Sequence, residues 1–444
     1  MHDTSLYSAE FLRVKGLAER GVAEAQHSLG FMYVNGQGVA QSDELAVSWY
    51  RRAATANLAQ AQYNLGVMLQ KGQGVTQDFM LAAHWYERAA SQGYALAQYN
   101  LGWLYAKGQG VAQDVGRALH WFRLAAEQGE PGAQHNLGMM YDTGKGVAQD
   151  HDAALDWYRR AASQGYARSQ YSLGLRYDSG QGVPQDDALA AIWYRRAAQQ
   201  GHAGAQDSLG MRHEHGQGVV QDAAQAAVWY RRAAEQGLPV AQYHLGQLLD
   251  TGNGVERDAV EATAWYRKAA EQGHLRAQFD LGLRHENGIG AAQDCVQALG
   301  WYRRAAAQGY AAAQYMVATL LDRHDLGDPA EATDWLHKAA DQKHALAQFE
   351  LGLRYDCGKG AERDYEAAHF WYLCAARQGH ARAQFNLGVM YAAGQGAQRD
   401  LVEAYAWLHR AGGAGIGPAR DYLARTARRM DAQQLSLAES LLHA

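Results

Sequence analysis

The segment Trp-Tyr-Arg-Arg-Ala-Ala recurs along the chain at a constant step, and this step limits the possible folds more than any other feature. Unchanged copies begin at Trp49, Trp157, Trp193, Trp229 and Trp301. Close variants begin at Trp85, Trp121, Trp265, Trp335, Trp371 and Trp407. Neighbouring copies lie 36 residues apart, except Trp301 and Trp335, which lie 34 apart. A fixed period of this size predicts a solenoid built from one repeated helical unit.

One unit, residues 94–129, shows how the repeat is expected to fold. Apolar residues within 95–106 follow the spacing of one helix face. Gly108 then predicts the end of that helix, because glycine adopts the left-handed C′ conformation at little cost. Asp114 lies where an N-cap belongs, and a second helix is expected to run from there to Gly129. The unit therefore predicts a pair of helices joined by a short turn.

Small residues at fixed positions predict close packing within each pair. A leucine followed by glycine recurs in the first helix, at Leu29, Leu65, Leu101, Leu137, Leu173, Leu209, Leu245, Leu281, Leu351 and Leu387. A glycine inside a helix costs about 1 kcal/mol relative to alanine, so its recurrence indicates a crossing too close for a Cβ atom. An alanine also lies three residues before each repeat Trp, where it leaves room for the indole ring.

These motifs together resemble the Sel1-like repeat family, a relative of the tetratricopeptide repeats. The shared pattern is Ala-Gln-x-x-Leu-Gly-x-x-Tyr, Gly-x-Gly-Val, Asp, Ala-x-x-Trp-Tyr and Ala-Ala, held in constant phase over eleven units. The resemblance implies an all-α fold, a right-handed superhelical solenoid of about eleven 36-residue helix-turn-helix repeats with terminal capping helices. It also implies that the first helix of each repeat lines a concave side and that the protein holds other proteins together.

The expected organisation has three parts. Residues 1–21 are predicted to form an N-terminal capping helix, residues 22–415 the eleven repeats, and residues 416–444 the C-terminal capping helices. In the last part, Pro418 is expected to open a helix, and Asp431 with Gln434 a capping box for residues 432–443. The ninth unit, near 310–343, has a loop two residues shorter than the others. This difference is either a tolerated deletion or a local change of superhelical pitch.

Composition argues against several other classes of protein. The net charge is −5, so bulk electrostatics favour neither nucleic acid nor anionic membranes. No apolar run is long enough to span a membrane, and the N-terminal residues lack the pattern of a secretion signal. The 3 cysteines, Cys295, Cys357 and Cys374, share no repeat position, which favours a reducing compartment. We therefore expect a cytoplasmic monomer without nucleic-acid or membrane partners.

The sequence contains no motif typical of catalysis or metal binding. The Gly-x-Gly loops follow helices and lack the Gly-Lys-Ser/Thr ending of a phosphate-binding loop. His213 and His285 occupy a slot that tyrosine fills in most units, so we interpret them as packing residues. Zinc-ligand spacings and nucleophile elbows do not occur. The doubled arginines are expected to be solvated or paired with acids, since acidic residues recur on the first helices. We expect a non-enzymatic protein with no cofactor and no metal.

The variable positions around Leu-Gly are the candidates for partner binding. The residues one before and three after the leucine share a helix face. They run from Asn64/Met68, Asn100/Leu104 and Asn136/Met140 to Ser172/Arg176, Ser208/Arg212, Asp280/Arg284 and Glu350/Arg354. The last two pairs have the spacing of intrahelical ion pairs. The surface thus changes from amide and apolar to ionic along the chain.

Our hypothesis is that this face forms a concave groove for a protein or peptide partner. The predicted partner-binding residues are Asn64, Asn100, Asn136, Met68, Trp103, Met140, Arg176, Arg212, Arg284 and Arg354. The asparagines would bond a partner backbone, while methionine and tryptophan would supply adaptable apolar contact. The methionines could alternatively pack inside the repeat. The predicted function is an interaction scaffold or adaptor; the alternative, which the family resemblance allows, is an immunity protein that neutralises a bacterial toxin.

Overall fold

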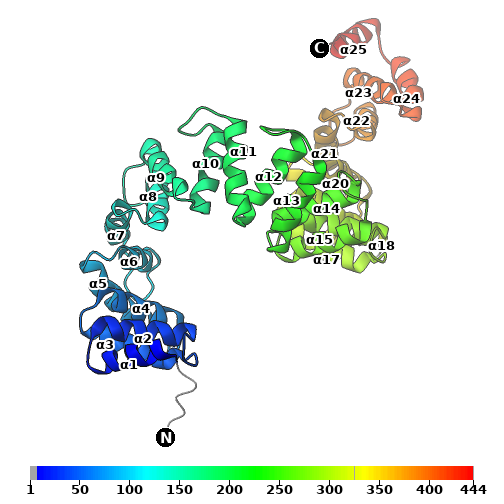
Figure 1. Cartoon of the computed structure of the whole chain (residues 1–444). Helices are drawn as coiled ribbons and strands as arrows, with labels where there is room; N and C mark the ends of the chain where they lie inside the picture. Colours follow the sequence, from blue (N-terminus) through cyan, green and yellow to red (C-terminus); the bar gives the residue numbers. More distant parts are fainter. Residues whose placement is uncertain (1–7, 325, 444) are drawn as a thin grey trace. The chain divides into compact units, whose positions relative to one another are not determined.

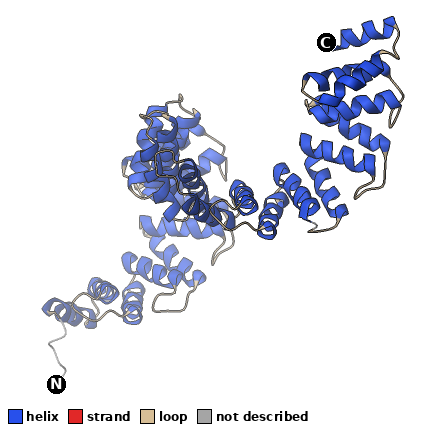
Figure 2. Cartoon of the chain, turned by 90° about the vertical axis from the view of Figure 1, so that its right-hand side faces the viewer, coloured by secondary structure: helices blue, strands red, loops and turns tan. Residues whose placement is uncertain are grey.

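A computed structural model describes residues 8–324 and 326–443, which form 25 α-helices and no strand (Figures 1 and 2). The chain divides into unit 1, Met1–Trp229, and unit 2, Tyr230–Ala444. In both units each repeat consists of a first helix, here helix A, and a second helix, helix B. The all-α repeat architecture predicted from the 36-residue period is therefore confirmed.

Unit 1 begins with α1 (Ala9–Glu19), whose N-cap is Ser8. Its A helices are α2 (Ala23–Asn35), α4 (Ala59–Lys71), α6 (Ala95–Lys107), α8 (Pro131–Thr143), α10 (Ala167–Ser179) and α12 (Ala203–His215). The corresponding B helices are α3 (Asp43–Thr55), α5 (Phe79–Ser91), α7 (Val115–Glu127), α9 (His151–Ser163), α11 (Asp187–Gln199) and α13 (Ala223–Glu235), the last of which contains the division between the units.

Unit 2 continues the same alternation. Its A helices are α14 (Pro239–Thr251), α16 (Leu275–Asn287), α18 (Ala311–His324), α20 (Ala345–Cys357) and α22 (Ala381–Ala393). Its B helices are α15 (Ala259–Glu271), α17 (Cys295–Ala307), α19 (Pro329–Asp341), α21 (Tyr365–Arg377) and α23 (Leu401–Gly413). Two further helices follow, α24 (Gly417–Ala427) and α25 (Ala432–His443).

The helix ends lie where the capping residues predict them. Gly108 follows α6 with φ +69°, the left-handed conformation that glycine adopts without a Cβ clash. Asp114 caps α7, because its carboxylate accepts a hydrogen bond from the N–H of Arg117 at 2.9 Å. Asp431 and Gln434 form the expected reciprocal capping box at α25, with bonds of 3.0 and 2.8 Å.

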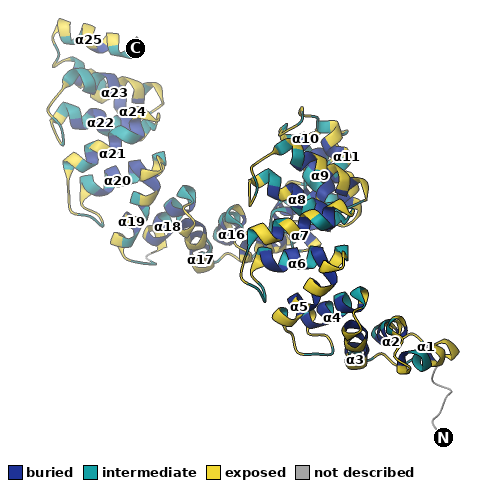
Figure 3. Cartoon of the chain, turned by 90° about the vertical axis from the view of Figure 1, so that its left-hand side faces the viewer, coloured by how far each residue is buried: buried dark blue, intermediate teal, exposed yellow. Residues whose placement is uncertain are grey.

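Each helix pair closes around a glycine and an aromatic ring. A Cβ atom added at Gly66 of α4 would lie 2.7 Å from the ring of Tyr86 on α5, and Tyr86 is fully buried. Ala82, three residues before Trp85, is also fully buried. The close crossing predicted from the Leu-Gly repeats is thus confirmed. Figure 3 shows the buried residues between paired helices and the exposed residues on the loops.

A ladder of buried glutamines joins successive repeats, a feature that we did not predict. Gln98 of α6 donates to the carbonyl oxygen of Ala90 on the preceding helix B at 3.1 Å. Its own amide oxygen accepts from Gln128, which follows the next helix B, at 2.7 Å. The same two bonds recur at other repeats, for example at Gln278. The glutamine of the Ala-Gln motif therefore satisfies helix-end carbonyls inside the core.

The ninth repeat departs from the pattern at its glycine and its loop. Ala318 replaces the helix-A glycine, and Leu336 stands where most other repeats have tyrosine. Both residues are buried, so a larger residue on one helix is matched by a non-aromatic residue on the other. Asp328 caps α19 by accepting from the N–H of Ala330 at 2.9 Å. Residue 325, inside the shortened loop, lies outside the described residues.

Candidate functional site

The helix-A face of unit 1 carries an apolar side chain at the same position in each of its six repeats. This position lies two residues after the leucine of Leu-Gly. We call these side chains the apolar stripe: Phe31, Val67, Trp103, Met139, Leu175 and Met211. Phe31, Met139, Leu175 and Met211 are 40–49% exposed, and Val67 and Trp103 are half-buried. A recurring exposed apolar position on neighbouring elements is the kind of surface that interaction sites use.

The predicted asparagines lie beside this stripe and are half-buried. Asn64 lies 2.9 Å from the imidazole Nε2 of His27 in the preceding repeat, and it also hydrogen-bonds to Tyr50. Burial raises the pKa of Tyr50 to about 12, which keeps its hydroxyl protonated. Asn100 similarly hydrogen-bonds to Tyr86. These two side chains thus serve internal contacts, which reduces their capacity to bond a partner.

The two predicted methionines are inside the protein, which corrects their proposed role as partner contacts. Met68 is 4% exposed and Met140 is 6% exposed. They lie three residues after the Leu-Gly leucine, where the helix turns toward the neighbouring repeat, and the exposed methionine of that turn is Met139. Packing inside the repeat, the alternative left open by the sequence, is therefore what the structure shows.

The four predicted arginines are also buried, with 3–5% of each residue exposed, and do not form part of the surface. Each forms an ion pair with an aspartate of the preceding repeat: Arg176 with Asp142, Arg212 with Asp178, Arg284 with Asp250 and Arg354 with Asp322. The last two pairs have N–O distances of 2.5 Å. The intrahelical pairs expected for Asp280/Arg284 and Glu350/Arg354 are thus replaced by pairs between repeats.

Hydrogen bonds show why these arginines can be buried. The guanidinium Nη1 of Arg284 donates to Thr263 Oγ1 at 2.8 Å and to the carbonyl oxygen of Ala259 at 3.1 Å. A buried charge needs a partner and satisfied donors, and this site supplies both. The sequence did contain a signal for the pairing. Every repeat with arginine at this position follows a repeat with aspartate two residues after the equivalent position, as Asp250 follows Leu248.

A cavity of about 240 Å³ brings three predicted residues together in unit 1. Trp103 of α6 and Asn136 and Met140 of α8 line it. Ala118 and Phe122 of α7 form its buried apolar floor. The remaining lining residues are Ala106, Lys107, Val115, Met139, Lys145 and Arg168. No acidic residue lines the cavity, so its rim is cationic and its interior apolar.

The equivalent spaces in unit 2 are lined by charged groups of both signs, with Arg284 in one and Arg323 in the other. A cavity of about 320 Å³ has Asp250 and Asp280 among its lining residues. Another, of about 200 Å³, has Asp322 and Glu350. Burial raises the pKa of the Asp280 and Glu350 carboxyls above the ordinary range, and the hydroxyl of Tyr243 donates to Asp280 at 3.0 Å. The change from amide and apolar to ionic character thus also appears in the cavities.

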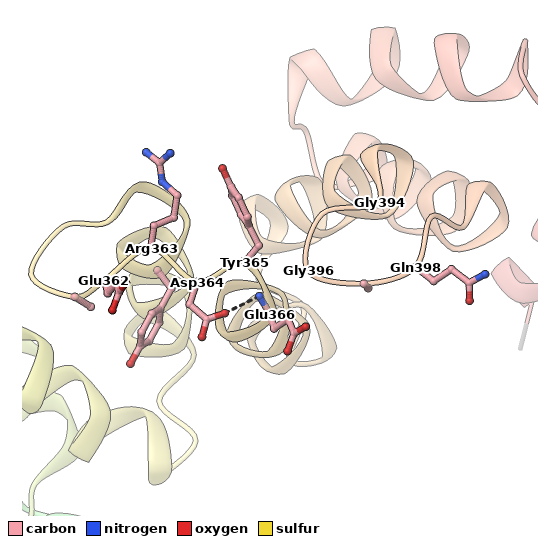
Figure 4. Close-up of a pocket in the computed structure, with 11 residues that line it drawn as sticks. Glu362, Arg363, Asp364, Tyr365, Glu366, Gly394, Gly396 and Gln398 are labelled. Carbon is pink, nitrogen blue, oxygen red and sulfur yellow. Dashed lines mark hydrogen bonds between the residues drawn. The ribbon is translucent and has the colours of Figure 1, made fainter.

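A cavity of about 940 Å³ lies between the loops that follow α20 and α22. Figure 4 shows Asp364 bonded to the N–H of Glu366, while Arg363 and Gln398 point in different directions. Asp364 caps α21, as aspartates at this position do in other repeats. The lining side chains therefore do not converge on one bound group, and this space is not our candidate site.

The doubled arginines and the histidines have structural contacts. The second arginine of the repeat lies over the preceding tryptophan ring, for example Arg304 over Trp301 with 4.3 Å from Cζ to the centroid. His285 is 3% exposed in the tyrosine slot, as expected of a packing residue.

Among residues 8–324 and 326–443, no three His, Cys, Asp or Glu side chains gather as metal ligands would. No helix in those ranges is long and apolar enough to cross a membrane.

Comparisons with known proteins agree with the repeat geometry. A family model described as the Sel1 repeat matches eleven consecutive segments: 23–58, 59–94, 95–130, 131–166, 167–202, 203–238, 239–274, 275–310, 311–344, 345–380 and 381–415. No curated protein sequence matches the chain.

Solved structures that are similar to this chain include the following two. One is a protective antigen present in uropathogenic Escherichia coli strains, described as displaying an SLR fold. It is 38% identical with a TM-score of 0.81, over 98% of this chain and 94% of that chain. The other is a Sel1 repeat protein from Oxalobacter formigenes, 33% identical with a TM-score of 0.54, over 70% of this chain and 91% of that chain. From its helix pairs, its motifs and these matches, the chain belongs to the Sel1 repeat family.

Proposed function

We propose that this protein is a non-enzymatic interaction scaffold that binds a protein or peptide partner on the helix-A face of unit 1. The apolar stripe is the observation that carries the proposal. Exposed apolar side chains such as Phe31 and Met139 occupy the same position in successive repeats. Packing of the repeat does not require an apolar residue at an exposed position, so polar residues would be accepted there. Apolar side chains that are kept exposed at one position over successive repeats favour a partner that covers them.

The burial of six predicted residues reduces the set that can contact a partner. Met68, Met140 and the four arginines hold repeats together, so partner selection rests with the stripe, the half-buried Trp103 and the asparagines beside them. Asn136 remains a candidate for bonding a partner backbone, because its amide lines a cavity. Solenoids suit this role, since neighbouring repeats present one continuous surface whose area grows with repeat number.

The three cysteines are free, which supports the cytoplasm as the proposed compartment. The immunity role stays a prediction of the family resemblance, and no feature of the site favours it over a general scaffold. The monomeric state is likewise a proposal, to be measured by light scattering.

The test compares two sets of substitutions at exposed apolar positions. One variant changes Phe31, Met139, Leu175 and Met211 to serine. The matched control changes Leu45, Met80, Leu189 and Val228, which are exposed on B helices. We expect the first variant to lose partners that the wild-type protein and the control both capture from native lysate, with unchanged circular dichroism. Equal capture by both variants would show that the stripe is not the binding surface.

A further inference from the structure

The cavity between α6, α7 and α8 has no counterpart of a polar pair that the preceding repeat has. In the preceding repeat, the hydroxyl of Tyr86 donates to the amide oxygen of Gln70 at 2.7 Å. Phe122 and Ala106 stand at the equivalent positions one repeat later. Phenylalanine lacks the hydroxyl and alanine lacks the amide, so the hydrogen bond of this pair has no equivalent here. Both residues line the cavity.

The same replacement changes the chemistry of the asparagine beside the cavity. Asn64 and Asn100 hydrogen-bond to the tyrosines Tyr50 and Tyr86 of their preceding B helices. Asn136 has Phe122 in that place, which offers no hydroxyl. An amide side chain carries two donors and an acceptor, and here they face a cavity. Asn136 is therefore able to bond a peptide backbone in a way that the other two asparagines are not.

The rim supplies a charge preference. Lys107, Lys145 and Arg168 all line the cavity and are exposed. In the part of the chain that the structure describes, none of the three forms an ion pair with a carboxylate. Burial, together with the nearby Arg168 charge, lowers the pKa of His135 to about 4, so this histidine is neutral at pH 7. Three cations around an apolar opening favour a ligand with carboxylates beside a hydrophobic group.

The size of the cavity limits what can enter. Pockets for drug-sized molecules or cofactors are roughly 300–1,000 Å³. At about 240 Å³ this one is smaller and fits a single large side chain. Trp103 and the exposed Met139 stand beside it and can adapt to that side chain.

We infer that this cavity takes a leucine-sized apolar side chain from an extended acidic segment of a partner protein. Asn136 bonds the backbone of the segment, and Lys107, Lys145 and Arg168 pair with flanking carboxylates. The inference rests on the proposed function, because it names the partner chemistry for one section of the helix-A face.

The test uses a capped synthetic peptide, Asp-Glu-Leu-Glu-Asp, and the full chain with ¹³C-labelled methionine methyl groups. Titration should shift the Met139 and Met140 methyl signals, with Met80 on a B helix as the unaffected reference. The peptides Lys-Lys-Leu-Lys-Lys and Asp-Glu-Ser-Glu-Asp test charge and the apolar side chain separately. We expect each to bind at least about tenfold more weakly than the first peptide, consistent with electrostatic and apolar contributions of ordinary size.

Two variants test the site itself. Ala106→Gln with Phe122→Tyr restores the pair that Gln70 and Tyr86 form one repeat earlier, so it should fold and fill the cavity. Lys107→Glu with Lys145→Glu reverses the exposed charge. Each should weaken binding by about tenfold or more.

Equal binding of the lysine peptide, or unchanged binding by the filled variant, overturns the inference. If the peptide instead shifts only Met211 of the apolar stripe, the cavity assignment fails while the proposed helix-A surface stands. If no methyl signal shifts, the acidic-segment inference fails, and the stripe substitutions decide the proposed function independently.

Discussion

Replacing Arg284 with methionine tests whether the ion pairs between repeats stabilise the solenoid. The side chain of Arg284 is 5% exposed and its guanidinium lies 2.5 Å from the Asp250 carboxylate. It also donates to Thr263 and to the Ala259 carbonyl oxygen. Methionine is the residue that Met140 provides at the same position in the fourth repeat, so the fold accepts its shape there.

The expected loss follows from these contacts. Two hydrogen bonds contribute about 1 kcal/mol each. Breaking a fully buried ion pair costs about 3–5 kcal/mol, because the remaining charge is left without a partner. The Asp250 side chain is 35% exposed, however, so water screens part of that penalty. We expect Arg284→Met to lower the free energy of local unfolding by about 2–3 kcal/mol in total.

Amide hydrogen exchange is the suitable assay, because long repeat arrays need not unfold in one step. Peptides from α14–α16 should exchange about 30- to 150-fold faster in the variant, since 1.4 kcal/mol corresponds to a factor of ten. Peptides from α2–α4 serve as the internal control. The double variant Asp250→Ala with Arg284→Met copies the natural pair Ala106 and Met140. It should recover to within about 1 kcal/mol of the wild type, because no buried charge is left unpaired.

The double variant also supplies the refutation. The single variant Asp250→Ala is measured as well. If the double variant is as unstable as Arg284→Met, or if its loss of free energy equals the sum of the losses in the two single variants, the aspartate and the arginine do not stabilise each other. The inter-repeat ion pair would then be a consequence of packing rather than a cause of it.

Two further predictions concern the core. Gly66→Ala should destabilise α4 and α5 by about 1–2 kcal/mol, because its Cβ would meet the buried Tyr86 ring and overpacking outweighs the gain in helix propensity. Gly300→Ala, where nothing lies within 4 Å of the added Cβ atom, should instead stabilise α17 by about 0.5–1 kcal/mol. Thermal unfolding and hydrogen exchange measure the effect of both substitutions. Destabilisation of equal size at the two sites would contradict the packing argument. Burial lowers the pKa of His135 to about 4, below the 6.5 of the unfolded chain, so its neutral form contributes its full stability above pH 6.5. That contribution to the free energy of unfolding should fall by about 1.4 kcal/mol per pH unit between pH 6.5 and 4. The variant His135→Phe introduces the residue found at the equivalent position, Phe279, and should remove this part of the pH dependence of hydrogen exchange in α8 and α9.

Local structure could be predicted from the sequence because each signal acts over a few residues. The recurrence of Trp-Tyr-Arg-Arg-Ala-Ala indicates a solenoid, glycines such as Gly108 mark helix ends, and aspartates such as Asp114 mark helix starts. The sequence also predicted the close approach of the helices. A recurring glycine inside a helix, as at Gly66, destabilises the helix and therefore indicates a crossing that leaves no room for a Cβ atom. These features need only backbone geometry and one neighbouring helix.

The candidate site could be predicted only in part. The sequence predicted Trp103, Asn136 and Met140 as partner-binding residues of two successive A helices, and the structure brings them around one cavity. It could not separate Met139 from Met140, because adjacent residues on a helix differ in direction by about 100° and either could face the neighbouring repeat. Met139 is 47% exposed and Met140 is 6% exposed.

Only the tertiary structure decided which residues hold the repeats together. Arg284 was predicted to pair along its own helix with Asp280, yet it reaches Asp250 on the preceding helix A. The difference arises because a buried guanidinium requires several acceptors at once, and helix stacking supplies Thr263 and the Ala259 carbonyl oxygen beside Asp250. The sequence by itself thus determined the repeat and its helix pair. The stacking of those pairs decided which of the variable residues stay inside and which remain available to a partner.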